Sequence, residues 1–456
     1  MQQSFSDALS THDFQGKEGE TIVLYVSGQS EKRVLLLGLG LSSSLNVEKL
    51  RRAYAAVVKT CHKHKWEEIN LCIPECLSMS RDDIIKGVSE GLLLPNYVFT
   101  ALKHHSIQDE KPVVLTKATF LGGSKADLQL AKKYAVISES VNFVRDLVNG
   151  NADDVTPQYL SAVAKGLEKT CNHVKTTVFD KKRIEKEKMG LLLAVNRASN
   201  LEPAFIMVSY RGNVKSSDHT VIVGKGVTFD TGGLLIKPRG GMETMKDDMA
   251  GAAAVMGVIQ AISSLGLKIN VTAVIPTTEN SIGSKSYKPG DVYKSYSGRT
   301  VEIVDTDAEG RLILADALSY TVKNLKPSRV IDVATLTGSI MVALGEEASG
   351  LMSNHDVLAD LLARAGSETG ERVWRMPLYD EYKDQLKSDI ADIKNTGSRF
   401  GGAITAATFL KEFVEEVPWA HLDIAGTAFH SESKRYLPKY ATGVGVRLLV
   451  SLLESL

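Results

Sequence analysis

The segment Asp305-Thr-Asp307-Ala-Glu309-Gly-Arg311-Leu312 places three acids within five residues and follows them with a glycine and an arginine. Upstream, residues 300–304 are apolar and rich in β-branched side chains, which predicts a strand. Downstream, residues 312–320 are mostly apolar and predict a buried helix. Open α/β sheets usually carry their functional sites on such strand-to-helix turns. We therefore predict an α/β fold with these acids at its functional end.

The acids of this turn favour a bound cation. Asp307 and Glu309 are two positions apart, so in an extended segment both side chains point the same way. Two converging carboxylates beside Arg311 repel each other unless a positive charge joins them, and a divalent metal ion meets that need. For this short segment taken alone, the alternative interpretation is a solvated acidic loop.

A second group of charged residues argues against the solvated loop. Residues 221–254 are otherwise apolar and rich in glycine, and glycines flank Lys225 and follow Asp230, which predicts tight backbone turns. A charge buried in such surroundings needs a partner. The charged residues of the two groups are Asp230, Asp248, Asp307, Glu309, Lys225, Lys237 and Arg311. Together they predict a site for two metal ions.

Further motifs follow one another between residues 140 and 430. They are Arg145-Asp-Leu-Val-Asn149, Lys288-Pro-Gly-Asp-Val292, Ala334-Thr-Leu-Thr-Gly338, Gly401-Gly-Ala-Ile-Thr405 and Trp419-Ala-His-Leu-Asp-Ile-Ala-Gly426. With the two charged groups, and in the same order, these motifs resemble the leucyl aminopeptidase (cytosol aminopeptidase) family of two-metal exopeptidases. The resemblance implies a metallohydrolase that acts on peptide substrates.

The resemblance also implies how two adjacent ions would be held. Asp230 and Glu309 would bridge both ions, and Asp307 would complete the first site. Lys225, as a neutral amine, and Asp248 would complete the second. A neutral lysine requires that nearby cations and burial lower its pKa strongly. Oxygen-rich ligation without histidine favours zinc or manganese, with cobalt or magnesium possible.

The remaining roles come from the resemblance as well. Lys237 would polarise the scissile carbonyl and stabilise the oxyanion. Arg311 would hold a bicarbonate ion as general base for the attacking water, and Leu336 would line that anion site. An apolar pocket that favours a leucine-like N-terminal residue would be lined by Met245, Thr335, Gly338, Ala425 and Ala428. Water that bridges two divalent ions loses a proton near neutral pH, which supplies the nucleophile.

One position departs from the family pattern beside the metal ligands. Asp305 stands where the family usually has asparagine. An added carboxylate either tightens cation binding or only accepts hydrogen bonds from the backbone. Both interpretations stay open at this stage.

The chain divides into two segments of different character. Residues 1–135 predict a smaller N-terminal α/β domain for assembly and packing, with helices at 47–64 and 81–102. A long helix at 127–148 joins it to the catalytic domain, residues 136–456. Short apolar strands at 221–223, 269–275, 301–304 and 330–333 predict a central mixed, mostly parallel sheet covered on both faces.

Composition excludes some functions. The 456 residues include 54 basic and 54 acidic side chains, so the formal net charge of zero gives no reason to expect DNA binding. No run approaches the ~18 apolar residues of a membrane span, and the N-terminus lacks the features of a signal peptide. We expect no membrane partner and a cytoplasmic location. The resemblance implies a homohexamer.

Two other classes of function stay in view. A relative without catalytic activity could regulate by binding DNA, and its binding would depend on salt because phosphate contacts release counterions. A carboxypeptidase or amidase could use the same two metals, and its activity would survive acetylation of the substrate N-terminus.

Overall fold

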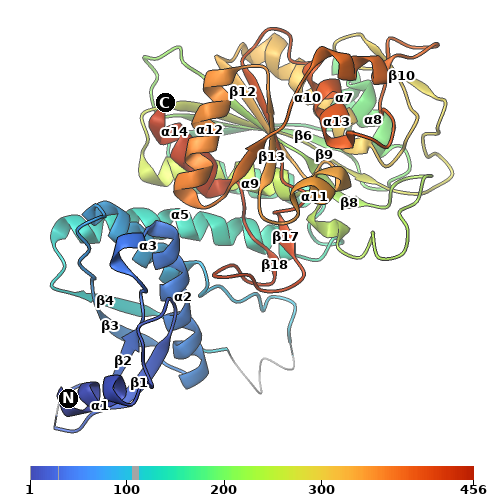
Figure 1. Ribbon diagram of the computed structural model, residues 1–456. Helices are drawn as coiled ribbons and strands as arrows, with labels where there is room; N and C mark the ends of the chain where they lie inside the picture. Colours follow the sequence, from blue (N-terminus) through green and yellow to red (C-terminus); the bar gives the residue numbers. More distant parts are fainter. Residues whose placement is uncertain (1, 29, 105–111) are drawn as a thin grey trace. The chain divides into compact units, whose positions relative to one another are not determined.

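The computed structural model describes residues 2–28, 30–104 and 112–456 (Figure 1). The chain forms two compact units. Unit 1 comprises Met1–Asn142 and Ser431–Tyr440, and unit 2 comprises Phe143–His430 and Ala441–Leu456. The segments expected from the sequence, 1–135 and 136–456, do not include this return of the chain to unit 1.

Unit 1 is a small α/β unit. Its strands form an antiparallel pair, β1 (Thr21–Tyr25) with β2 (Arg33–Leu37), and a parallel pair, β3 (Glu68–Cys72) with β4 (Lys117–Leu121). Its helices are α1 (Gln2–Ser10), the 3-10 turn η1 (Ser42–Ser44), α2 (Val47–His64), α3 (Arg81–Leu93) and the first part of α5 (Lys125–Asn149). The buried faces of α2 and α3 pack together and form its apolar core.

Two of the three helices expected here are confirmed, and one is shorter than expected. The helices predicted at 47–64 and 127–148 correspond to α2 and α5. The helix predicted at 81–102 ends at Leu93. Pro95 follows within two residues, and a proline has no N–H to continue the ladder of helical hydrogen bonds.

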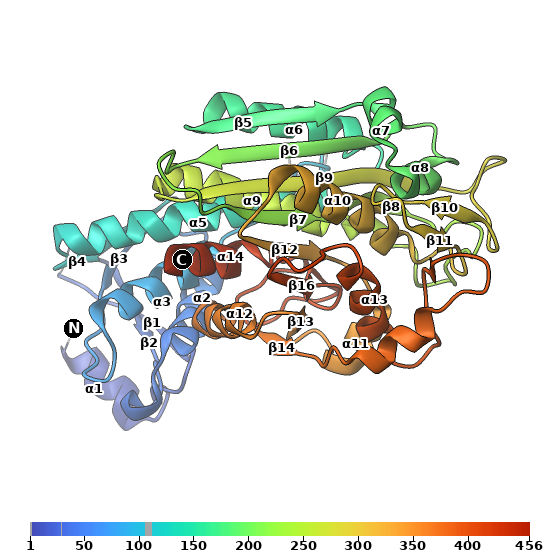
Figure 2. The ribbon, with the colours of Figure 1, turned by 90° about the horizontal axis from the view of Figure 1, so that it is seen from above.

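A mixed sheet forms the centre of unit 2. Its strands lie in the order β14-β13-β16-β12-β7-β9-β6-β5, which Figure 2 shows from above, and β8 also pairs with β9. The strands are β5 (Val174–Phe179), β6 (Ala204–Arg211), β7 (Thr220–Gly224), β8 (Gly226–Asp230), β9 (Asn270–Asn280), β12 (Arg329–Ala334), β13 (Ser349–Ser353), β14 (Val373–Arg375) and β16 (Trp419–Asp423). The central strands β9, β7, β12 and β16 are parallel, whereas β5, β6 and β13 pair antiparallel.

Helices cover this sheet on both faces (Figure 1). One layer consists of α9 (Ala250–Leu265), α12 (Asp356–Thr369) and α14 (Val446–Ser455). The other consists of α8 (Gly190–Asn196), α10 (Glu309–Leu325), α11 (Gly338–Leu344) and α13 (Gly402–Lys411), while α6 (Pro157–Thr170) and α7 (Lys181–Glu187) lie against β5 and β6. The central strands are therefore almost completely buried, as their largely apolar sequences predict. None of the helices among the described residues is long and apolar enough to cross a membrane.

The strand predicted at 301–304 does not belong to the large sheet. It is β11 (Thr300–Glu302), which lies between β10 (Val292–Lys294) and β15 (Ile393–Lys394) in a separate small sheet. Beyond Glu302 the N–H of Ile303 still donates to the carbonyl of Asp291 at 2.8 Å, but the N–H groups of Val304 (2.8 Å) and Asp305 (3.2 Å) donate to the side chain of Asn395, which ends the ladder. The remaining short elements are η3 (Asp380–Leu386), β17 (Phe429–His430) and β18 (Tyr440–Ala441).

A buried carboxylate holds the start of the C-terminal helix α14. Glu371 accepts hydrogen bonds from the backbone N–H groups of Gly445 (3.0 Å) and Leu448 (2.9 Å) and from Nε of Arg447 (3.1 Å). The N–H groups of a first helical turn have no partners within the helix, and a negative charge is favourable at that end. This one side chain therefore ties α14 to the segment that follows α12.

Glu371→Ala should lower the free energy of unfolding by about 3–5 kcal/mol, because Nε of the buried Arg447 loses its carboxylate partner and two N–H groups at the start of α14 lose their acceptor. The exposed pair between Arg364 and Glu368 provides the control, since Arg364 is 78% exposed. Arg364→Ala should cost no more than ~1 kcal/mol. Urea denaturation measures both values, and equal losses would contradict this role of Glu371.

Candidate metal centre

Two charged residues of the site lie at the ends of adjoining strands. Lys225 stands between β7 and β8, and Asp230 is the last residue of β8. After Asp230 the chain turns sharply through Gly232 and Gly233, whose φ angles of +85° and +65° favour glycine. This turn leads to Lys237, which lies back against the carboxylates.

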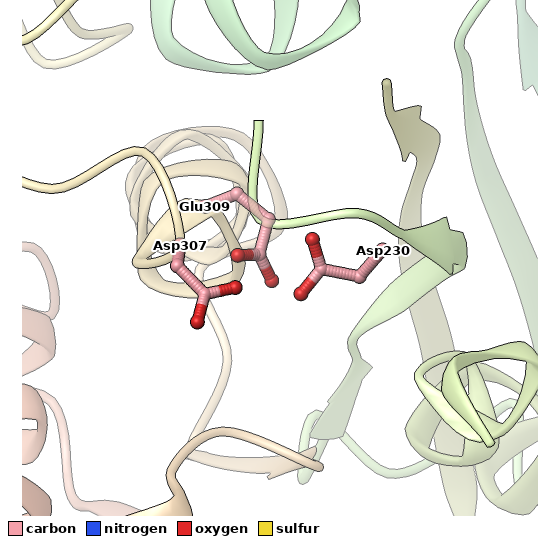
Figure 3. Close-up of side chains that lie close together, drawn as sticks. All are labelled: Asp230, Asp307 and Glu309. Atoms are coloured by element: carbon pink, nitrogen blue, oxygen red, sulfur yellow. The ribbon is translucent and has the colours of Figure 1, made fainter. Parts of the chain in front are cut away.

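The acid turn brings Asp307 and Glu309 to Asp230. The extended geometry assumed for it is wrong, since Glu309 is already the first residue of α10. The carboxylates converge nevertheless, because the turn directs Asp307 and Glu309 toward Asp230 at the end of β8 (Figure 3). One oxygen from each of Asp230, Asp307 and Glu309 lies within 4.8 Å of the other two.

Lys225 joins two further parts of the site. Its Nζ lies 2.8 Å from Asp248 Oδ1, which follows the 3-10 turn η2 (Met245–Asp247), and 2.8 Å from Glu309 Oε1. It also donates to the carbonyl oxygen of Thr335 at 2.8 Å. The absence of a side chain at Gly310 leaves room for the Lys225 ammonium group, because a Cβ at residue 310 would lie only 2.7 Å from Nζ. The lysine therefore fills the space between the start of α10 and the end of β12.

Lys237 occupies the other side of the carboxylates. Its Nζ lies 2.8 Å from Asp230 Oδ2 and 2.5 Å from Asp307 Oδ1. Burial opposes the charge of Lys237, but Asp230 and Glu309 outweigh it and raise its pKa above the ordinary value. Lys237 is thus an ammonium ion at neutral pH, directed at the point where the acids meet.

The pKa of Lys225 is set by the same two opposing effects, burial and neighbouring carboxylates. Burial would lower it, yet the carboxylates of Asp248 and Glu309 raise it well above the ordinary value. The neutral lysine that the resemblance implies therefore requires that a divalent ion displace this proton, as metal binding commonly does.

The carboxylates retain unused capacity to bind a cation. Among the residues that the structure describes, Asp248 Oδ2 and Glu309 Oε2 are buried without a hydrogen-bond partner. Burial raises the pKa of Asp248 well above the ordinary value, and burial together with Glu309 raises the pKa of Asp307. Free carboxylate oxygens and crowded negative charges fit hard or borderline divalent ions. The donor set thus suits metal ions.

Arg311 lies beside this cluster on the first turn of α10. Its side chain is buried, and Nη1 donates to the carbonyl oxygen of Asn395 at 2.9 Å. Within the described part of the chain, its Nε has no hydrogen-bond partner. Burial lowers the pKa of Arg311, so a small anion would find here a poorly solvated guanidinium with a free donor.

Asp305 bonds to the backbone of its own turn. Its Oδ1 accepts the N–H of Asp307 at 2.8 Å. The main chain of Asp305 is held in turn by Asn395, which donates to its carbonyl at 2.6 Å. Of the two interpretations of Asp305, these contacts favour the structural one, because an asparagine oxygen could accept the same N–H.

The residues expected to bind substrate differ from one another in their exposure and in their contacts with the acid cluster. Thr335 lies at the site, and its hydroxyl donates to Asp248 at 2.8 Å. The N–H of Leu336 donates to Asp423 Oδ1 at 3.1 Å. Gly338 at the start of α11 faces open space, whereas Ala428 is only 3% exposed. Met245 and Ala425 are partly buried.

Uncharged polar residues, which the sequence does not mark as functional, fix the acids in place. Buried Asn280 donates to Asp230, buried Tyr287 donates to the carbonyl of Thr306, and buried Asn395 donates to the carbonyl of Asp305 in the acid turn. The available signal was weak. Asn280 follows Thr278 and Glu279 at the end of a strand, and polar residues there more often end a strand than serve a site.

Comparisons with known proteins agree with this geometry. The family model described as the cytosol aminopeptidase family, catalytic domain, matches residues 142–450, and the N-terminal domain model of the same family matches residues 1–106. A probable cytosol aminopeptidase of Protochlamydia amoebophila is 57% identical over 99% of this chain and 91% of its own length. One from Chlamydia felis is 49% identical over 98% and 90%.

Solved structures are similar over the same extent. The bottromycin maturation enzyme BotP in complex with Mn has a TM-score of 0.90 at 31% identity, over 98% of this chain and 96% of that one. A mutant tomato leucine aminopeptidase has a TM-score of 0.88 at 33% identity, over 99% and 87%.

Asp305→Asn should leave stability within about 0.5 kcal/mol of the wild type, because the side-chain acceptor for the N–H of Asp307 is retained. Asp305→Ala removes that acceptor and should cost about 1 kcal/mol. Thermal unfolding measures both. A large loss of Mn²⁺ affinity in Asp305→Asn at unchanged stability would instead assign the carboxylate to the cation site.

Proposed function

The chain belongs to the cytosol aminopeptidase family and is a metal-dependent aminopeptidase, and we propose that the charged cluster of unit 2 is its active centre. The observation that carries the proposal is the convergence of Asp230, Asp307 and Glu309 on one point between Lys225 and Lys237. The repulsion between these three carboxylates is tolerated where nearby positive charge compensates it.

Two divalent ions would be held by five side chains. Asp230 and Glu309 would bridge them, Asp307 would complete one site, and Lys225 and Asp248 would complete the other. When bound, the ions supply an acidified water as nucleophile and polarise the substrate carbonyl. Manganese has support from the Mn complex of BotP, zinc suits the same ligands, and cobalt or magnesium is possible by the same chemistry.

Lys237 would stabilise the charge that develops on the substrate. Its raised pKa keeps the ammonium protonated at neutral pH, and its Nζ lies within hydrogen-bond distance of Asp230 and Asp307. A donor fixed in this way can bind the oxygen of the scissile carbonyl as that oxygen becomes negative. Removal of one such donor typically costs 10²- to 10³-fold in rate.

Arg311 would hold the general base. Its buried Nε has no partner among the described residues, which leaves a donor for a small anion such as bicarbonate. Bicarbonate held there would accept the proton of the attacking water. The N–H of Leu336 already donates to Asp423, so the contacts of this anion would come first from the arginine.

The substrate would be a peptide with a free N-terminus. An unblocked α-amine can bind a cation beside the carboxylates, whereas an acetylated amine cannot, so only the first peptide bond would be placed for hydrolysis. The name of the tomato enzyme supports a preference for leucine-like residues, with Met245, Thr335, Gly338, Ala425 and Ala428 as the proposed pocket. A cytoplasmic location and a homohexamer are part of the same proposal, and sedimentation tests the latter.

Leu-p-nitroanilide should release p-nitroaniline in the presence of Mn²⁺ or Zn²⁺, and its N-acetylated form should not. A chelator should abolish the release. Hydrolysis of both substrates would indicate an amidase. Failure with every metal, together with salt-dependent binding of duplex DNA, would indicate a regulator without this activity.

Asp307→Ala and Lys237→Ala should separate metal binding from catalysis. The first should lower the Mn²⁺ content of the protein and abolish turnover, because a ligand is lost. The second should retain the metal yet lose about 10²- to 10³-fold in kcat. Elemental analysis beside steady-state kinetics measures both, and full activity of Lys237→Ala would show that its role is assigned wrongly.

A further inference from the structure

A buried asparagine stands directly behind the convergent acids. Asn280 is the last residue of β9 and is fully buried. Strand β8 runs parallel to β9, and their pairing sets Asn280 opposite Asp230. The backbone carbonyl of Asn280 also accepts the N–H of Thr231 at 3.0 Å, so the asparagine is fixed to this strand end by its main chain.

The side-chain amide of Asn280 joins two parts of the site. Its Nδ2 donates to Asp230 Oδ1 at 2.7 Å and to the carbonyl oxygen of Thr306 at 3.0 Å. These acceptors belong to the two segments that carry Asp230 and Asp307. Both neighbours are acceptors only, so the amide orientation is determined by chemistry, since a flipped amide would direct its oxygen at a carboxylate and a carbonyl.

This contact selects which oxygen of Asp230 faces the other acids. Oδ1 accepts from Asn280 and from the N–H of Gly232 at 2.8 Å. Oδ2 remains, and it lies against Nζ of Lys237 at 2.8 Å. Two donors on one oxygen fix the rotation of the carboxylate, so the other oxygen is directed toward the centre.

The same carbonyl of Thr306 receives a second donor. The buried hydroxyl of Tyr287 donates to it at 2.7 Å. The hydroxyl of Thr306 in turn donates to the carbonyl of Gly232 at 2.6 Å and accepts the N–H of Leu235. The peptide before Asp307 is therefore fixed in orientation, and hydrogen bonds connect Thr306 to the turn that follows Asp230.

We propose that Asn280 is a positioning residue of the cation site, which sets the spacing and orientation of the Asp230 and Asp307 carboxylates before a cation binds. Without this amide, repulsion between the carboxylates would rotate Asp230 and move the two segments apart. The proposal rests on the proposed function, because it assigns Asn280 to the metal centre of that function. An aspartate could not replace it, since a further carboxylate would face Asp230 and the carbonyl of Thr306.

Asn270 offers a matched control at the opposite end of β9. It is also buried, and its amide donates to three backbone carbonyls, those of Asn213 (2.7 Å), Ser216 (3.0 Å) and Asp218 (3.3 Å). None of these partners belongs to the acid cluster. Loss of either asparagine should therefore destabilise the protein, but only loss of Asn280 should change the affinity for a cation.

The test is titration of the full-length, chelator-treated protein with MnCl₂ by calorimetry, beside thermal unfolding of each variant without metal. Asn280→Ala should weaken Mn²⁺ binding by about 10- to 100-fold, the range found when a residue that orients a metal ligand is removed. Asn270→Ala should lower the melting temperature and leave the Mn²⁺ affinity as in the wild type. Tyr287→Phe, which removes one of the two donors to Thr306, should give a smaller loss of affinity than Asn280→Ala.

Unchanged Mn²⁺ affinity in Asn280→Ala would overturn the proposal, as would equal losses of affinity in Asn280→Ala and Asn270→Ala. If Asn280→Ala does not fold, Asn280→Ser and Tyr287→Phe carry the test, and wild-type affinity in both would overturn it. Failure of the proposed function is distinguishable, because the wild type itself would then neither bind Mn²⁺ nor hydrolyse Leu-p-nitroanilide.

Discussion

Mutual repulsion of closely spaced carboxylates is the constraint on which the centre of this protein depends. Asp230, Asp307 and Glu309 bring negative charge to one point, and Asp248 adds more beside it. At short range inside a protein such repulsion is large, and it is tolerated only with compensating cations. Lys225 and Lys237 supply that compensation, each in contact with two carboxylates. The cluster of carboxylates is therefore expected to bind further positive charge.

The fold meets this constraint by bringing distant segments to one edge. The end of β8, the start of α10 and the loop after β12 each supply charged or polar groups. These groups can come into contact because the backbones of the three segments lie close together. Gly310 shows how narrow the tolerance is, because any side chain there would collide with Lys225. Polar residues without charge then fix the geometry, so the rigid part of the site extends well behind the acids.

Sequence patterns predicted the charged residues better than their surroundings. The acids and lysines could be identified because charge is rare in apolar, glycine-rich segments, and the buried parallel strands because their β-branched runs are distinctive. The strands that pair with β11 could not be predicted, since this short ladder depends on the position of Asn395, which is far away in the sequence. The end of α3 at Leu93 is explained by Pro95, which cannot continue the ladder of helical hydrogen bonds. Asn280 and Thr306 carry no local sign of their role, because their partners lie far away in the sequence.

The return of Ser431–Tyr440 to unit 1 bears on the order in which the chain folds during synthesis. Tyr436 donates to Glu48 at 3.0 Å, so the contacts of unit 1 include residues from near both ends of the chain. At roughly 5–20 residues per second, the ribosome needs on the order of tens of seconds to complete the intervening segment. The apolar core around α2 and α3 lies within residues 35–120 and is therefore synthesised early, whereas the segment that completes unit 1 is made only after most of unit 2.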